Sequence, residues 1–407
     1  MRVLLSTIGS RGDVQPLAAL AVALRERGAQ VRLCVPPDFK AWLEALGFHV
    51  TPVGPVLRST GKARPSGPPP TPEQRRQMIE GTIATQFETI AAAAEACDLI
   101  VGATALQVAA PSVAERLRVP YIFAAFCPAV LPSRHHAPPL LPIPGQTPPG
   151  VMDDYTPLWD ADAQRWNQLW LDPINAHRAS LGLDAIQDVR SYVLTRTPWL
   201  AADPVLAPWP DGAGGSVVQT GAWLLNDDRP LPAELETFLA AGAPPVYFGF
   251  GSIRAPEGAA STIVAAARAA GRRAVVSRGW AELTLPAEAT DCLLIDEVNQ
   301  QALFPRVAAV VHHGGAGTTT AAARAGTPQV VVPQIYDQPY WAQRVAELGI
   351  GIAHDGPVPT LATLSHALEG ATQDGVRSQA TRVRAQISGE GAALAAARLI
   401  DHAQRHA

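Results

Sequence analysis

Short apolar runs alternate with longer segments of helical periodicity along the first half of the chain. The runs cover residues 3–5, 31–35, 99–101 and 121–124. After the first run, apolar side chains recur at Leu17, Leu20, Ala21 and Leu24, the spacing of a helix that begins near Pro16. Strands that alternate with helices predict a parallel sheet with helices on both faces.

The same alternation restarts in the second half. Apolar runs cover residues 217–219, 246–250, 274–277, 293–295, 308–311 and 329–332, and the chain looks helical from Val376 almost to its end. Between the halves, residues 203–216 combine stiff prolines with a glycine cluster, which is typical of an interdomain linker. Two Pro-rich segments, residues 52–72 and 128–157, predict long surface loops. An acceptor-binding role is favoured for these loops, with disorder as the alternative.

One segment of the second half predicts an anion site. After the apolar run 308–311, glycines at Gly314, Gly315 and Gly317 allow a sharp turn and a close backbone approach, and helix formers follow Thr318. A helix N-terminus therefore faces the turn, and its free N–H groups favour an anion, with His313 and the Thr318 hydroxyl as further donors. The alternative is a tight strand-to-helix connection without a ligand.

Motifs at both ends of the chain extend this interpretation. The GSRGD turn at residues 9–13 and the HHGGAGT segment at residues 312–318 resemble the nucleotide-sugar-dependent glycosyltransferases of the GT-B type, family 1. The chain most resembles those that glycosylate vancomycin-type glycopeptide antibiotics, and the likeness includes AADPVLAPW, VQTGAW, PPVYFGFGS, SRGW and RVAELGIG.

The resemblance implies two Rossmann-like α/β domains that face each other across a cleft. The expected divisions are an acceptor domain at 1–203, a linker at 204–216, a donor domain at 217–387, and a last helix at 388–407 that packs back on the first domain. Ligands of open parallel sheets bind beyond the carboxyl ends of the strands, so we expect the active site in the cleft.

The first turn supplies the candidate catalytic residue. Gly9, Ser10, Arg11, Gly12 and Asp13 fall within five positions. Glycosyl transfer needs a base for the acceptor hydroxyl and a cationic or amide-rich site for the departing diphosphate. The resemblance implies that Asp13 is this base; its alternative role is a helix cap. Arg11 would reach the donor phosphates, or form a surface salt bridge.

The resemblance also implies a donor site in the second half. Ser252 would bind the diphosphate, Trp280 would stack on the base, and the Val298 backbone would hydrogen-bond the base. The diphosphate cradle would comprise His313, Gly315, Ala316, Gly317 and Thr318, and the sugar hydroxyls would bind Asp337 and Gln338. The alternatives are core packing for Trp280, an Asx turn for Asp337, and, for the neighbouring His312, a core histidine rather than a ligand.

The identity of the nucleotide is predicted from one position at which the chain differs from plant-type relatives. Plant-type relatives carry a glutamate eight residues after the cradle histidine that binds the ribose hydroxyls, and here that position is Ala321. We therefore expect a dTDP-sugar rather than a UDP-sugar as the donor. No further cofactor is expected. The expected reaction is direct displacement with inversion, in which a hydroxyl of a hydrophobic natural product attacks the sugar.

Composition excludes several other classes. A net charge of −4 without a basic block argues against nucleic acid, and no run approaches a membrane span or a signal core. Four widely separated cysteines predict reduced thiols in a cytoplasmic protein, which we expect to be a monomer. No metal is expected, because Asp160 and Asp162 are interpreted as helix-start carboxylates and His135 and His136 lack spaced partners.

Other functions remain open at this point. Gly249-x-Gly251 and Gly315-x-Gly317 each follow a strand, as in a dinucleotide-dependent oxidoreductase, but Arg254 and Thr320 stand where a third glycine belongs. A nucleotide-sugar epimerase, an inactive nucleotide-sugar binder, and transfer to a sterol, lipid or polyketide acceptor are the further alternatives.

Overall fold

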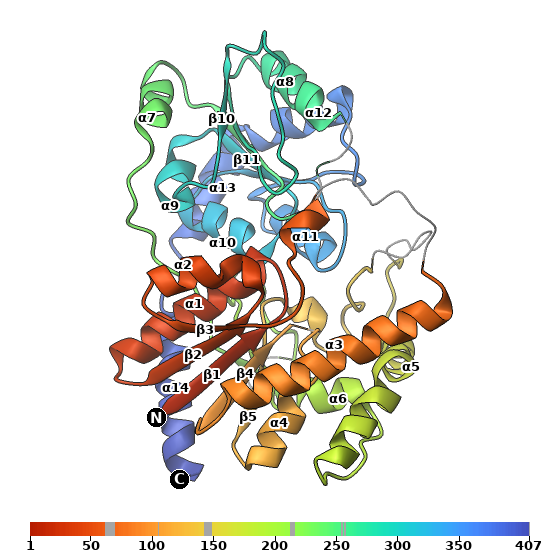
Figure 1. Ribbon diagram of the computed structural model, residues 1–407. Helices are drawn as coiled ribbons and strands as arrows, with labels where there is room; N and C mark the ends of the chain where they lie inside the picture. Colours follow the sequence, from red (N-terminus) through yellow and green to blue (C-terminus); the bar gives the residue numbers. More distant parts are fainter. Residues whose placement is uncertain are drawn as a thin grey trace.

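Two parallel sheets form the framework of the protein (Figure 1). The computed structural model describes residues 1–61, 70–104, 106–141, 149–211, 216–253, 255 and 258–406. The parts of the predicted loops and linker at residues 62–69, 142–148 and 212–215 lie outside the described residues, as does Arg254.

The first sheet has seven strands in the order β3-β2-β1-β4-β5-β6-β7, and all neighbours are parallel. Its strands are β1 (Arg2–Thr7), β2 (Gln30–Val35), β3 (His49–Pro52), β4 (Leu99–Ala103), β5 (Tyr121–Ala125), β6 (Trp199–Leu200) and β7 (Val218–Gln219). Its helices are α1 (Arg11–Glu26), α2 (Lys40–Ala45), α3 (Pro72–Ala93), α4 (Ala110–Leu117), α5 (Thr156–Ser180) and α6 (Val189–Leu194), with short 3₁₀ turns at Pro37–Phe39, Arg58–Gly61 and Pro128–Val130.

The second sheet has six parallel strands in the order β10-β9-β8-β11-β12-β13. Its strands are β8 (Val246–Gly249), β9 (Ala274–Ser277), β10 (Cys292–Ile295), β11 (Ala309–His312), β12 (Gln329–Val331) and β13 (Gly351–Ala353). The helices that follow the first domain are α7 (Ala233–Ala240), α8 (Ala259–Ala269), α9 (Gln300–Leu303), α10 (Ala316–Ala325), α11 (Gln338–Glu347), α12 (Leu361–Ala371), α13 (Asp374–Arg384) and α14 (Gly391–His406), with a 3₁₀ turn at Phe304–Arg306.

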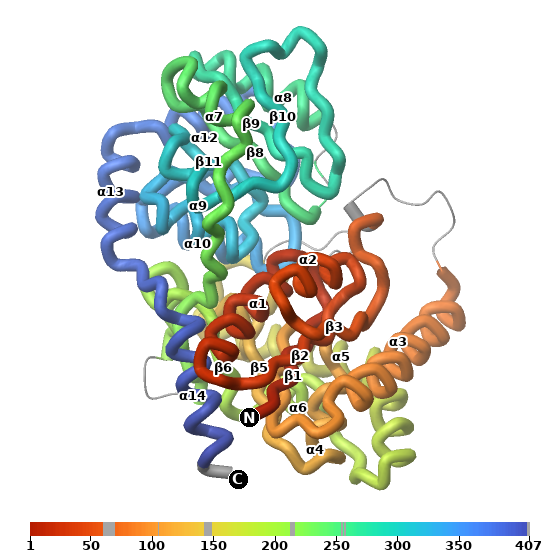
Figure 2. Tube along the Cα trace, turned by 60° about the vertical axis from the view of Figure 1, so that its left-hand side comes forward, coloured from red at the N-terminus to blue at the C-terminus, as the bar shows by residue number. Residues whose placement is uncertain are grey.

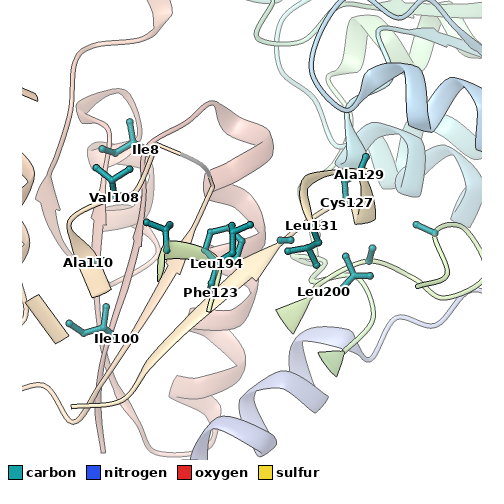
Figure 3. Close-up of a cluster of buried hydrophobic side chains, with 14 of the residues drawn as sticks. Ile8, Ile100, Val108, Ala110, Phe123, Cys127, Ala129, Leu131, Leu194 and Leu200 are labelled. Carbon is teal, nitrogen blue, oxygen red and sulfur yellow. The ribbon is translucent and has the colours of Figure 1, made fainter. Parts of the chain in front are cut away.

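The central strands are buried on both faces, which explains their uninterrupted apolar sequence. In β1, Leu5 joins the apolar cluster under α1 and α14, whereas Leu4 joins the cluster on the opposite face. That second cluster also contains Ile100 and Phe123 (Figure 3) and continues through the turn after β5 to Trp341 of α11. The two domains therefore share part of one apolar core.

The predicted fold class of two Rossmann-like parallel-sheet domains is confirmed, but one strand was assigned to the wrong sheet. We expected residues 217–219 to open the second domain, whereas β7 lies beside β6 at the edge of the first sheet. The Val218 N–H donates to the Pro198 carbonyl at 2.9 Å and the Thr220 N–H to the Leu200 carbonyl at 2.9 Å. The chain thus crosses to the second domain only after this edge is completed.

The end of the chain returns to the first domain. Helices α13 and α14 are separate, and α14 packs on α1 with Ala395, Ala396 and Leu399 fully buried (Figure 2). The buried Asp203 carboxylate accepts hydrogen bonds from the Val205 N–H at 2.8 Å and the Ser388 N–H at 3.0 Å. This aspartate joins the start of the linker to the chain where it returns. The exact domain limits stay a prediction.

Candidate active site

Asp13 lies in the first turn of α1, directly after the carboxyl end of β1. Ser10 is the N-cap: its hydroxyl accepts from the Gly12 N–H at 3.3 Å, while Asp13 Oδ2 accepts from the Ser10 N–H at 2.6 Å. A side chain at Gly9 would place Cβ 2.2 Å from Asp13 Oδ2, so only glycine fits there. The capping role of Asp13 is therefore present, and it fixes the carboxylate in one position.

The surroundings of Asp13 suit a base that works near neutral pH. Burial raises the pKa of Asp13 to about 7; the Ser10 hydrogen bonds oppose this shift, and the negative charge of Asp337 adds to it. Asp13 as a whole residue is partly exposed, although its carboxyl is buried enough for its pKa to rise. A carboxylate with this pKa is ionised in a large fraction of molecules at pH 7 and still binds a proton well.

Arg11 is held by a carboxylate from the other domain. Its guanidinium makes two contacts with Glu297, at 3.0 Å and 2.9 Å, and lies 3.8 Å above the centre of the Trp42 ring. Glu297 follows β10 and is more than half exposed. Of the two roles considered for Arg11, the structure shows the salt bridge, and this bridge connects the two domains.

The turn after β11 has the geometry of an anion site. Gly314 has φ +93°, and α10 begins at Ala316 with Gly315 as an N-cap that makes no side-chain hydrogen bond. The first N–H groups of α10 are therefore available to a ligand. Gly317 is exposed with nothing near its Cβ position, and within the described residues the Thr318 hydroxyl has no hydrogen-bond partner.

The two histidines of this turn have different roles. His312 is fully buried: Nδ1 accepts from the Gly314 N–H at 3.1 Å and Nε2 lies 2.9 Å from Gln329 Oε1. Because Nδ1 is an acceptor, the proton lies on Nε2 and the ring is neutral. Burial holds the pKa of His312 at about 3, and this residue is the core histidine that was expected as its alternative.

His313 lies between two glycine backbones. A Cβ atom added at Gly251 would lie 3.0 Å from Cε1 of His313, and one added at Gly315 would lie 2.7 Å from its Nε2. Burial lowers the pKa of His313 to about 4, although the nearby Gly249 backbone opposes the shift. His313 Nδ1 makes no hydrogen bond of normal geometry in the described part of the chain. At neutral pH this ring offers a neutral donor rather than a positive charge.

Of the other predicted donor-site residues, Ser252 and Trp280 are connected to this turn through Gly251. Ser252 follows Gly251 and is half-buried, and the Trp280 N–H donates to the Gly251 carbonyl at 2.9 Å. The Trp280 ring stacks on Phe39 of the first domain, with centroids 6.1 Å apart. Val298 packs at the edge of the apolar cluster below β10. The structure thus gives Trp280 an interdomain contact that the sequence did not indicate.

Asp337 and Gln338 follow β12 at the start of α11. Asp337 Oδ2 accepts from the Trp341 indole N–H at 2.9 Å, and burial raises the pKa of Asp337. Gln338 is buried, and its side-chain oxygen accepts the backbone N–H groups of Gln334 at 2.8 Å and Ile335 at 3.1 Å. Gln338 therefore shapes the turn that presents Asp337.

Sequence reasoning did not find three residues of this region, which are Phe39, Trp42 and Glu297. Each contacts a predicted site residue from the opposite domain or from a neighbouring element. No periodicity or motif marks them, because their roles depend on which loops meet in space.

The excluded metal candidates have structural partners. Asp162 is a buried ion-pair partner of Arg165 and Arg190, and Asp160 is exposed on α5. His135 lies 3.2 Å from Asp211. Among the described residues, no group of three or more His, Cys, Asp or Glu side chains could hold a metal ion, and no helix could cross a membrane.

Two surface hollows lie apart from the predicted catalytic residue. One, of about 500 Å³, lies between α4 and α6 and is lined by Glu115, Tyr121 and Tyr192 among others. The other, of about 160 Å³, is lined by Ala321 together with Gln301 and further residues. Because both sets of lining residues omit Asp13, we place the site by strand-end geometry rather than by the size of a hollow.

Comparison with known proteins identifies the family to which the chain belongs. Residues 3–133 match the glycosyltransferase family 28 N-terminal domain, and residues 284–396 match the C-terminal domain of erythromycin biosynthesis protein CIII-like proteins. The solved structure of the glycosyltransferase VinC in complex with dTDP is similar over 100% of both chains, with a TM-score of 0.65 and 22% identity.

Three curated relatives from Amycolatopsis orientalis are similar over nearly their whole length. Glycosyltransferase GtfE is 50% identical over 97% of this chain and 96% of its own, and vancomycin aglycone glucosyltransferase is 48% identical over 100% and 98%. The dTDP-epi-vancosaminyltransferase is 44% identical over 94% and 93%. The chain therefore belongs to the GT-B glycosyltransferases, in the group of the vancomycin-type glycopeptide glycosyltransferases.

Proposed function

We propose that this enzyme transfers a sugar from a dTDP-sugar to a hydroxyl group of a glycopeptide antibiotic aglycone, with inversion at the anomeric carbon and without a metal ion. Asp13 removes the proton of the acceptor hydroxyl as its oxygen attacks the anomeric carbon. The bond from that carbon to the diphosphate breaks, and the diphosphate leaves with the bonding electrons toward the N-terminus of α10.

The observation that carries this proposal is the position of Asp13. The carboxylate is fixed by Ser10, is raised in pKa to about 7, and is close enough to Asp337 to be influenced by its charge. A base beside a residue that is suited to bind sugar hydroxyls fits attack on a sugar held between the two domains.

The leaving group is proposed to bind at the start of α10. The free N–H groups after Gly315, the Thr318 hydroxyl and one N–H of His313 would together stabilise the diphosphate charge. This set of donors supports a mechanism that does not depend on a cation. Ser252 directly follows Gly251, whose backbone lies against the ring of His313, and would add a further hydroxyl.

Thymidine is proposed as the nucleoside. Ala321 offers no carboxylate for ribose hydroxyls, and one close relative is named as using a dTDP-linked sugar. Isothermal titration calorimetry with dTDP and UDP tests this choice. We expect tighter binding of dTDP; equal or tighter binding of UDP would show that the nucleoside assignment is wrong.

The acceptor class has its own test. Vancomycin aglycone and a sterol are each incubated with dTDP-glucose and UDP-glucose, and the products are identified by mass spectrometry. We expect a glycosylated peptide product. A glycosylated sterol alone would favour the lipid alternative, and donor turnover without any acceptor would favour an epimerase or a hydrolase.

A further inference from the structure

Tyr336, which directly precedes Asp337, has an unusual backbone for an aromatic residue. Its φ is +58°, in the left-handed region where a side chain crowds the backbone and glycine is favoured. Its side chain is also 48% exposed, and it is packed into none of the four apolar clusters of the described residues. Folding alone therefore gives no reason for a tyrosine at this position.

A backbone pair with the first domain holds Tyr336 in place. The Leu140 N–H donates to the Tyr336 carbonyl at 3.2 Å, and the Tyr336 N–H donates to the Leu140 carbonyl at 2.5 Å. Leu140 belongs to the Pro-rich segment 128–157, which the sequence predicts to bind the acceptor. The pair thus joins the predicted acceptor loop to the segment that presents Asp337.

The surroundings of the phenol are consistent with the same region. Burial raises the pKa of Tyr336, and the negative charge of Asp13 raises it further. Because Tyr336 is nevertheless 48% exposed, a ligand can touch it.

We propose that Tyr336 is an acceptor-binding residue: its ring packs against an apolar or aromatic face of the acceptor and determines which acceptor hydroxyl reaches Asp13. A strained backbone that glycine would adopt more easily is retained because the ring has a function there. The Leu140 pair fixes the ring between the two domains. This inference rests on the proposed function, in which Asp13 is the base.

The test uses two substitutions with opposite expectations. Tyr336→Gly removes the ring and relaxes the backbone while both backbone hydrogen bonds remain possible, and Tyr336→Phe keeps the ring. Initial rates are measured with vancomycin aglycone and dTDP-glucose, and dTDP affinity is measured by calorimetry. For Tyr336→Gly we expect the acceptor KM to rise about tenfold or more, with the Kd of dTDP within about twofold of the wild type. Tyr336→Phe should keep the wild-type acceptor KM.

Arg118→Gly is the matched control. Arg118 also has a left-handed backbone, with φ +57°, at the end of α4 and far from α11 (Figure 1). It should change neither KM nor the Kd of dTDP. A wild-type acceptor KM in Tyr336→Gly would overturn the proposal, as would an equal rise in KM for Arg118→Gly. Failure of the proposed base would appear separately, as full turnover by Asp13→Asn.

Discussion

The carboxylates of Asp13 and Asp337 come from opposite domains, and the negative charge of Asp337 raises the pKa of Asp13. They are separated by more than 300 positions in the sequence, and each follows the carboxyl end of a strand, Asp13 after β1 and Asp337 after β12. This relationship connects the proposed base to the residue that is proposed to hold the donor sugar.

Asp337→Asn should therefore shift the pH dependence of the enzyme. Asp13 acts as a base only when it is ionised, so kcat/KM of the wild type should fall as the pH drops through about 7. Without the negative charge of Asp337, the ionised form of Asp13 is more stable and the pKa of Asp13 falls. The fall in kcat/KM, which is the acidic limb of the pH profile, should therefore move to lower pH. Asparagine can still accept the Trp341 indole N–H. A limb that stays in place or moves to higher pH would contradict the proposed coupling.

The free energy of unfolding should also depend on Asp13. The folded-state pKa of about 7 lies above the unfolded value of about 3.9, so the folded state binds this proton more tightly. The resulting stability is fully present below about pH 4 and is lost as the pH rises through 7. Asp13→Asn should remove this part of the pH dependence while its amide oxygen still caps Ser10. Urea unfolding of both proteins at pH 5 and pH 8 measures the difference, and equal pH dependence would count against the raised pKa.

The two neighbouring histidines should respond differently to substitution by alanine. His313→Ala should weaken dTDP binding by about tenfold, because a single donor to a charged group contributes about 1.5 kcal/mol or more. Its folding stability should change little. His312→Ala should lower the free energy of unfolding by about 1–3 kcal/mol, since the buried Gly314 N–H and Gln329 oxygen lose their partner. Calorimetry and urea unfolding separate the two effects, and equal effects of both substitutions on dTDP binding would argue against the assignment.

Arg11 and Glu297 provide a test of competition for the donor. If the diphosphate binds Arg11, Glu297 competes with it, so Glu297→Ala should tighten dTDP binding a few-fold at low salt and less at high salt. Arg11→Ala should weaken the same binding. The measurement is calorimetry at two ionic strengths. A Kd unchanged by Arg11→Ala would assign Arg11 to the salt bridge alone.

The sequence was sufficient to predict most of the strands that lie in apolar runs. The largely apolar runs at β1, β2, β8 and β11 predicted their strands to within one or two residues, because buried parallel strands need such runs. Strand β6 has two residues and β13 begins at a glycine, so neither produces a recognisable pattern. The sheet to which β7 belongs is decided by its partner β6, which the pattern of β7 does not encode.

The candidate site was predictable where one segment defines it. The glycines beside Asp13 and His313 are local signals, since each permits a close contact within its own turn. The contacts of Arg11 with Glu297 and of Trp280 with Phe39 were not predictable, because each joins residues that are more than 200 positions apart. One sequence carries no record of which distant residues meet.

Turnover and dTDP binding by Asp13→Asn test the central claim most directly. The substitution keeps the cap on Ser10 and removes the base, so kcat with vancomycin aglycone and dTDP-glucose should fall by about 10²–10⁴-fold. The Kd of dTDP, measured by calorimetry on the same sample, should stay within about twofold of the wild type. Wild-type turnover by this variant would contradict the assignment of Asp13 as the base.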